Sequence, residues 1–194
     1  MFSAVSLVVI LFEYWLKVPE LRSYRLILGD ISIITKRRLP LRSIEHFQEQ
    51  IATIFQEAMS IPSFTNTETE REIEDYLDQR IGSIPYFKSH PQHFGRYPLP
   101  NDHLHRSVNW ALVDKGKKKT VILFHHHDTV DLEDYGPLAP IALDSEALVH
   151  ALKSIDFRSE MQEDLDSGQW QFGRGSCDMK AALALQLGVL EAYA

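Results

Sequence analysis

The 194-residue sequence contains a single cysteine, Cys177. One cysteine cannot form an internal disulfide, so the fold must be stabilised by its core, and a reducing, cytoplasmic compartment is expected. Basic residues are also few, with 20 Lys and Arg against 27 Asp and Glu and a formal net charge of −7. Proteins that bind nucleic acids in general carry a basic surface, so we expect no nucleic-acid partner.

The N-terminal apolar segment is too short to span a membrane. Met1–Phe12 carries no charge, but a spanning helix needs roughly 20 apolar residues. A basic leading region and a clear small-residue cleavage site are both missing, which disfavours a signal peptide. Lys36-Arg37-Arg38 could flank a membrane anchor, which remains the minor alternative. We therefore expect residues 1–40 to be an N-terminal extension without an assigned role.

The rest of the chain has the patterns of a globular α/β domain. Hydrophobic residues make up 44% and charged residues 24%, as in ordinary globular proteins. Ser107–Val113 and Thr120–Phe124 are predicted strands paired as a hairpin, and Pro85–His105 a loop whose four histidines lie on the surface. Apolar spacing and capping residues predict helices over Leu41–Met59, Thr67–Ile81, Asp144–Ile155, Arg158–Asp166 and Met179–Ala194. This order predicts an α/β sandwich with a mixed sheet.

The second predicted helix begins with a capping signal. Thr67 and Glu70 have the spacing of a capping box, in which each side chain bonds the other residue's backbone N–H. The helix carries several further charged residues, including Glu74, and the simplest interpretation is that they form one solvated face.

The strand ending at Phe124 is followed directly by three histidines and an aspartate. Side chains alternate along a strand, so His126 and Asp128 should point one way and His125 and His127 the other. Open α/β sheets hold their ligands at the carboxyl ends of strands. We interpret His126 as a metal ligand and Asp128 as a catalytic residue that orients it. A histidine-rich run is often only a solvated loop, and this segment alone does not decide between the two.

A second segment strengthens the metal hypothesis. Gly173 to Lys180 reads Gly-Arg-Gly-Ser-Cys-Asp-Met-Lys, a glycine-bounded loop that brings Asp178 to the start of an apolar helix. Together with His126-His127-Asp128, this segment resembles the co-catalytic zinc hydrolases of peptidase family M-twenty, which include aminoacylase and acetylornithine deacetylase. Ser60-Ile61-Pro62-Ser63 also looks like that family's N-terminal segment. The long spacer between the two motifs looks most like the arginine-utilisation, RocB-like branch.

The resemblance implies a zinc-exopeptidase-like catalytic domain, a three-layer sandwich, that holds two zinc ions, with cobalt or manganese as substitutes. Asp178 matches the ligand that bridges the two ions, and His126 matches a terminal ligand. The implied substrate is a small peptide or an N-acyl amino acid. The resemblance also implies that His126 and Asp178 approach each other and that the Asp178–Met179 peptide is cis.

The sequence departs from the family pattern in one respect. The family's general base and a further ligand are two adjacent glutamates, and no Glu-Glu pair occurs here. We therefore expect residues 41–194 to be the N-terminal part of a catalytic domain and the chain alone to be inactive. A truncated non-catalytic protein and a membrane-anchored interaction module that uses Met1–Val18 are the alternatives.

Overall fold

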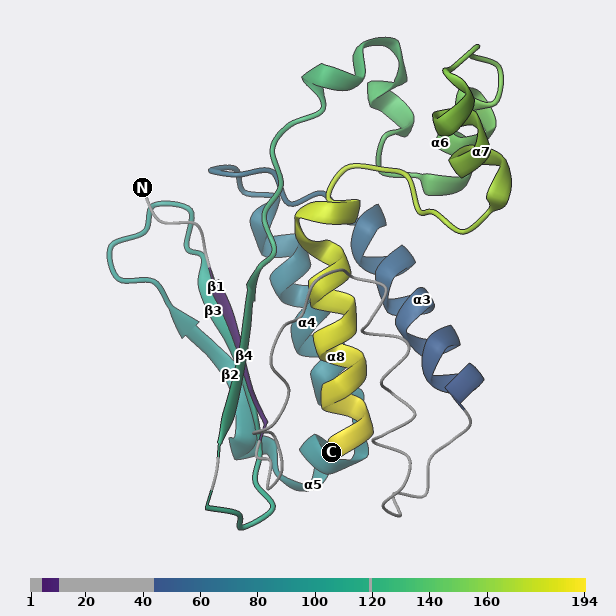
Figure 1. Ribbon diagram of the computed structural model, residues 1–194. Helices are drawn as coiled ribbons and strands as arrows, with labels where there is room; N and C mark the ends of the chain where they lie inside the picture. The colour runs from purple at the N-terminus through teal and green to yellow at the C-terminus, as the bar shows by residue number, and fades with distance from the viewer. Residues whose placement is uncertain (1–4, 11–43, 119) are drawn as a thin grey trace.

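The computed structural model describes residues 5–10, 44–118 and 120–194, which form a mixed α/β structure (Figure 1). The strands are β1 (Val5–Ile10), β2 (Phe94–Pro98), β3 (Ser107–Val113) and β4 (Val121–His126). The helices are α3 (Ile44–Ser60), α4 (Glu70–Ser83), α5 (Pro85–Ser89), α6 (Ser145–Leu152), α7 (Ser159–Ser167) and α8 (Ala181–Tyr193). Short helical turns are η1 (Pro91–His93), η2 (Glu133–Ile141) and η3 (Ser176–Lys180).

The four strands form one mixed sheet in the order β2-β3-β1-β4. β1 runs parallel to β3 and antiparallel to β4, and β2 is antiparallel to β3. The predicted mixed sheet is thus present, but the predicted β3–β4 hairpin is wrong, because β1 lies between the two strands. Turn-forming residues between two strands indicate that the chain reverses direction there. They do not show whether a strand from another part of the chain lies between the two.

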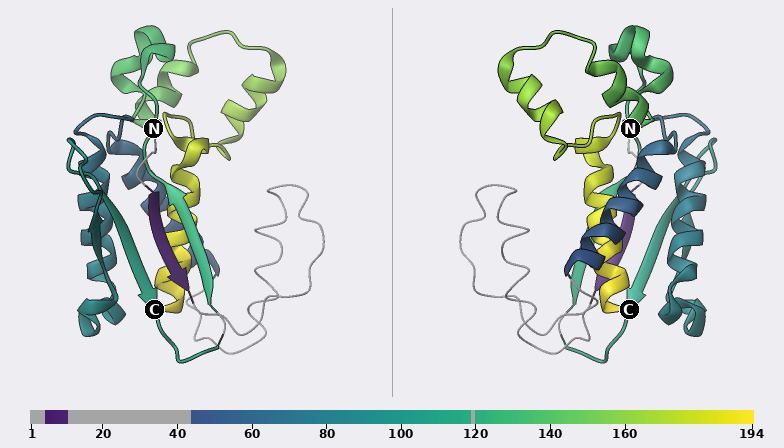
Figure 2. Two further views of the ribbon diagram at one scale, coloured as in Figure 1. Left: turned by 90° about the vertical axis from the view of Figure 1, so that its left-hand side faces the viewer. Right: turned by 90° about the vertical axis from the view of Figure 1, so that its right-hand side faces the viewer.

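Helices α3, α4 and α8 pack on one face of the sheet, as Figure 1 shows. On β3 the residues that face them are buried and alternate with half-buried ones. On β4, Ile122 is 58% exposed and Phe124 is 65% exposed. In the left view of Figure 2 no helix of the described residues covers this outer face. The described part of the chain therefore has two layers, and the third layer of the expected sandwich remains a prediction.

The core lies between these helices and the sheet. It contains Ile54 and Ala58 of α3, Ile73 and Leu77 of α4, Ala111 and Val113 of β3, and Leu183, Leu187 and Leu190 of α8. Helices α3 and α8 approach closely at Gly188, where a Cβ atom would lie 2.6 Å from Cγ1 of Ile51. The predicted C-terminal helix is confirmed, although it begins at Ala181.

Helix α4 corrects two expectations. Glu70 and Glu74 are both fully buried, whereas the sequence suggested a solvated charged face. The capping box is also absent, because the Thr67 hydroxyl donates to the Phe64 carbonyl and Glu70 accepts from the backbone N–H of Asn66. Both carboxylates are held by arginines that come later in the chain, Arg106 at 3.0 Å from Glu70 and Arg96 at 3.6 Å from Glu74. Local periodicity does not reveal such distant partners.

The segment predicted as a loop between Pro85 and His105 contains α5, η1 and the edge strand β2. The prolines and glycine in this segment indicated a loop. Prolines are tolerated in an edge strand, however, so they did not exclude β2. Asp144 caps α6 as predicted, by accepting a hydrogen bond from the Ala147 N–H at 3.0 Å. Among the described residues, none of the helices has the length and apolar character needed to cross a membrane.

Candidate functional site

The candidate site lies at the upper end of β4 in Figure 1, where α8 also begins. His126 is the last residue of β4, and its side chain is 32% exposed. His125 and His127 are buried instead. This difference follows from the alternation of side chains along a strand. His126 Nδ1 lies 3.1 Å from Oδ1 of Asp128 and 3.2 Å from the Asp128 carbonyl oxygen.

The glycine loop brings Asp178 to the same end of the sheet. Gly175 has a φ of +82°, and a Cβ atom there would lie 2.8 Å from Cγ2 of Thr129. Glycine allows both this conformation and this close approach. Upstream, the Arg174 N–H donates to the Ala142 carbonyl, and its guanidinium pairs with Asp134 at 2.7 Å. The Asp178–Met179 peptide is cis, as expected.

The two predicted metal ligands meet, although 52 residues separate them. His126 Nε2 lies 2.9 Å from Oδ1 of Asp178, which confirms the expected approach. The Asp178 side chain is 84% exposed, so its second oxygen remains accessible from solvent.

The donor set suits a cation. Each nitrogen of the His126 ring faces a carboxylate, Asp128 on Nδ1 and Asp178 on Nε2. A neutral imidazole has one proton and can donate to only one of them. Either an imidazolium or a cation at Nε2 satisfies both contacts, and imidazole with carboxylate is a common zinc-binding combination. Within residues 46–118 and 120–194, no three His, Cys, Asp or Glu side chains are grouped so as to hold a metal ion. The metal-binding roles of His126 and Asp178 and the catalytic role of Asp128 therefore remain predictions.

The neighbouring histidines are structural in character. His125 Nδ1 lies 2.7 Å from the side-chain oxygen of Gln186 on α8. His127 is fully buried, and neither ring nitrogen has a hydrogen-bond partner among the described residues. Burial lowers the pKa of His125 and lowers that of His127 to about 3. His127 is therefore neutral at physiological pH.

The sequence interpretation gave no role to Lys180, two residues after Asp178. Lys180 is fully buried, and its Nζ donates to the Ile61 carbonyl at 2.5 Å. Burial lowers its pKa to about 8. The bond ties the glycine loop to the segment that follows α3. The available signal was the position of Lys180 directly before an apolar helix, but lysines are rarely buried completely, so the signal was weak.

The segment 63–66 was also missed as part of the site. Ser63 Oγ donates to the His127 carbonyl at 2.7 Å, and Thr65 Oγ1 donates to Oδ2 of Asp128 at 2.7 Å. Two hydroxyl residues around a proline turn are common in loops, so their spacing alone does not predict these contacts.

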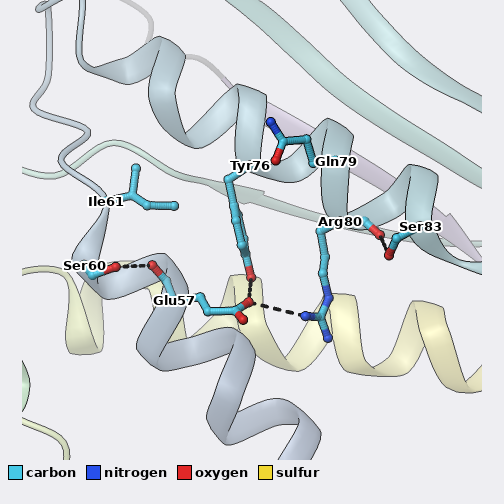
Figure 3. A pocket seen from close by; sticks show the side chains of 7 residues that line it. All are labelled: Glu57, Ser60, Ile61, Tyr76, Gln79, Arg80 and Ser83. Atoms are coloured by element: carbon cyan, nitrogen blue, oxygen red, sulfur yellow. Dashed lines mark hydrogen bonds and ion pairs between the residues drawn. The ribbon is translucent and has the colours of Figure 1, made fainter.

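A separate groove lies between α3 and α4 (Figure 3). Its volume is about 440 Å³. Glu57 accepts a hydrogen bond from the Tyr76 hydroxyl and pairs with Arg80, so these polar groups satisfy one another. Burial and the Glu57 carboxylate raise the pKa of Tyr76. The lining residues are Glu57, Ser60, Ile61, Tyr76, Gln79, Arg80 and Ser83. None of the predicted site residues is among them.

Comparison with known proteins identifies two relatives in Bacillus subtilis strain 168. The chain is 35% identical to Protein RocB over 144 residues, which cover 73% of the chain and 25% of RocB. It is also 35% identical to the uncharacterized protein YqjN over 147 residues, 74% of the chain and 26% of YqjN. The chain thus spans about a quarter of the length of these curated relatives.

The similarity supports a RocB-like relationship, in agreement with the resemblance seen in the spacer between the motifs. Membership of the zinc peptidase family is not shown by these relatives. No family model matches the chain. No solved structure matches it either.

Proposed function

We propose that the chain supplies part of the active site of a metal-dependent hydrolase that cleaves amide bonds in small peptides or N-acyl amino acids. One observation carries the proposal: the imidazole of His126 and the carboxylate of Asp178 meet at 2.9 Å from opposite ends of a 52-residue span. Asp128 lies behind the histidine, as a carboxylate that orients a metal-binding imidazole does.

Each of the three side chains has a distinct role in the proposal. Asp178 offers two oxygens, which suits a carboxylate shared by two ions. His126 binds through Nε2, and Asp128 holds the proton on Nδ1 and increases the basicity of the ring. A bound zinc ion supplies Lewis acidity and lowers the pKa of a coordinated water. A catalytic zinc normally takes three protein ligands, so this pair requires further ligands from another part of a longer protein or from a partner.

The similarity to RocB supports a place in arginine utilisation for the whole protein. The amide substrate follows from the family resemblance of the two motifs. The whole protein's activity is part of the proposal, because the chain spans about a quarter of RocB.

Metal titration tests the proposed ligands. We would titrate the chain with zinc by calorimetry and with cobalt by visible absorption, beside His126→Ala and Asp178→Ala. Matched controls are His150→Ala and Asp156→Ala, which remove exposed residues of the same types. We expect each site variant to weaken binding at least tenfold and the controls to match the wild type. Equal binding by the site variants would contradict the ligand assignment, and absence of binding in the wild type would favour a non-catalytic protein.

Turnover is the second measurement. The chain alone, supplied with zinc, cobalt or manganese, should not hydrolyse N-acyl amino acids or dipeptides appreciably, because only two ligands and no general base are identified. Turnover that survives purification and disappears in both site variants would refute this expectation. The first residues to examine as additional ligands would then be Asp128, Asp131 and Glu133.

A further inference from the structure

The segment after α3 is held against the loop that follows β4. The Thr129 N–H donates to the Ser63 carbonyl at 2.8 Å, and the Thr65 N–H donates to the Thr129 carbonyl at 2.8 Å. Phe64 and Thr129 form a parallel bridge between these bonds. The backbone pairing fixes the register of the segment and brings the Thr65 side chain beside Asp128.

A buried ion pair supports the other end of this segment. The Asn66 N–H donates to Oε1 of Glu70 at 2.6 Å, and the same oxygen lies 3.0 Å from the Arg106 guanidinium. Glu70 is fully buried and Arg106 nearly so. Because breaking a buried, hydrogen-bonded pair is strongly unfavourable, the residue after Thr65 has a fixed position.

The two oxygens of the Asp128 carboxylate have different partners. Oδ2 accepts from the Thr65 hydroxyl at 2.7 Å, and Oδ1 lies 3.1 Å from His126 Nδ1. The Asp128 side chain is only 8% exposed. The Thr65 hydroxyl also lies 3.0 Å from the Thr129 carbonyl. It has one proton, and the carboxylate is both the closer and the charged acceptor, which makes it the stronger partner.

These contacts favour Nδ1 as the nitrogen of His126 that carries the proton. Nδ1 faces two oxygens of Asp128, and a carboxylate and a carbonyl can only accept. Nε2 also faces a carboxylate, Asp178, but that side chain is 84% exposed and is solvated by water. The buried Asp128 carboxylate therefore takes the single proton of the neutral ring through Nδ1, and the lone pair is on Nε2, directed toward Asp178. Rotation of the Asp128 carboxylate would remove the Oδ1 contact, leave only the backbone carbonyl facing Nδ1, and so weaken the preference for the Nδ1–H tautomer.

We propose that Thr65 is a positioning residue for the site: its hydroxyl fixes the Asp128 carboxylate, which holds His126 as the Nδ1–H tautomer with Nε2 available to a metal. The link to metal binding rests on the proposed function, but the tautomer of His126 does not. Loss of such an outer partner typically lowers metal affinity about 10- to 100-fold.

The test compares two substitutions of one side chain. Thr65→Val keeps the shape and removes the hydroxyl, and Thr65→Ser keeps the hydroxyl. Thr67→Val is the control, because the Thr67 hydroxyl donates to the Phe64 carbonyl in the same turn at 2.7 Å. ¹⁵N shifts of the His126 ring, recorded at a pH where it is neutral, report the tautomer, and cobalt titration reports affinity.

We expect Thr65→Val to lower the Nδ1–H population and to weaken cobalt binding about tenfold or more. Thr65→Ser and Thr67→Val should match the wild type in both measurements. An unchanged tautomer in Thr65→Val, or an equal change in Thr67→Val, would overturn the positioning role. If neither the wild type nor any variant binds cobalt, the proposed function fails. The tautomer measurement still decides the role of Thr65 in that case.

Discussion

The two halves of the candidate site are built in different ways. The half that follows β4 is enclosed: Asp128 is 7% exposed, and it contacts both His126 and Thr65. The half that precedes α8 is open, since the Asp178 side chain is 84% exposed where it contacts His126. One half is fixed by the fold before any ligand binds, whereas the other presents a carboxylate to solvent. Substitutions should therefore affect folding in the first half and ligand binding in the second.

The largest effect is expected where the enclosed half is anchored. Arg106→Met leaves the Glu70 carboxylate buried without its cation and should lower the free energy of unfolding by about 3–5 kcal/mol. Arg71→Met, an exposed arginine on the same helix as Glu70, should change it by less than about 0.5 kcal/mol. Urea unfolding measures both, and similar midpoints for the two variants would show that the buried pair does not anchor this half.

Gly175 tests the close contact between the two halves. Gly175→Ala combines a positive φ with an approach of 2.8 Å to Thr129, whereas Gly168 has a similar φ of +64° and open space. Overpacking should make Gly175→Ala less stable than Gly168→Ala by about 1–3 kcal/mol. Thermal unfolding of the two variants gives this difference directly. Equal losses of stability in the two variants would mean that the positive φ, and not the contact with Thr129, requires the glycine.

Acid should destabilise the enclosed half through His127. Its pKa is about 3 in the folded chain and 6.5 ordinarily. Between these pH values the unfolded chain binds a proton at His127 that the folded chain does not. The neutral His127 therefore causes no loss of stability above pH 6.5, and the free energy of unfolding falls as the pH decreases below it. The expected loss from this group between pH 7 and pH 5 is about 2 kcal/mol.

His127→Gln should show a smaller loss of stability than the wild type over that pH interval, as measured by urea unfolding at both pH values. His150→Gln, which replaces an exposed histidine, should keep the wild-type dependence. If His127→Gln also keeps it, the buried ring is not the source of the acid sensitivity.

The smallest effects on folding are expected at the two aspartates. Asp128→Asn disturbs the buried contacts with Thr65 and His126 and should lower stability by about 1–2 kcal/mol. Asp178→Asn, at an exposed position, should stay within about 0.5 kcal/mol and yet weaken zinc binding. Unfolding measures the stability of both variants, and calorimetry measures their zinc binding. A larger loss of stability in Asp178→Asn than in Asp128→Asn would contradict the distinction between the two halves.

Several parts of the fold were predictable from local patterns. The apolar spacing gave α3 and α8, the aspartate cap gave α6, and alternation along β4 separated His126 from its two neighbours. The place of β1 in the sheet was not predictable, because it depends on pairing with strands about a hundred residues away. The burial of Glu70 and Glu74 was missed for the same reason, as the two arginines that neutralise them come from β2 and the residue before β3.

The amino-acid sequence by itself determined which side chains could form the candidate site. His126 and Asp128 follow from the alternation expected at the end of a strand, and Asp178 follows from the resemblance of its glycine loop to that of the zinc hydrolases. Only the tertiary structure decided that His126 and Asp178 meet and that Thr65 holds Asp128. The physical reason is range: periodicity acts through bonded neighbours, whereas these contacts join residues 52 and 63 positions apart. Packing α8 and the segment after α3 against the sheet brings those residues together.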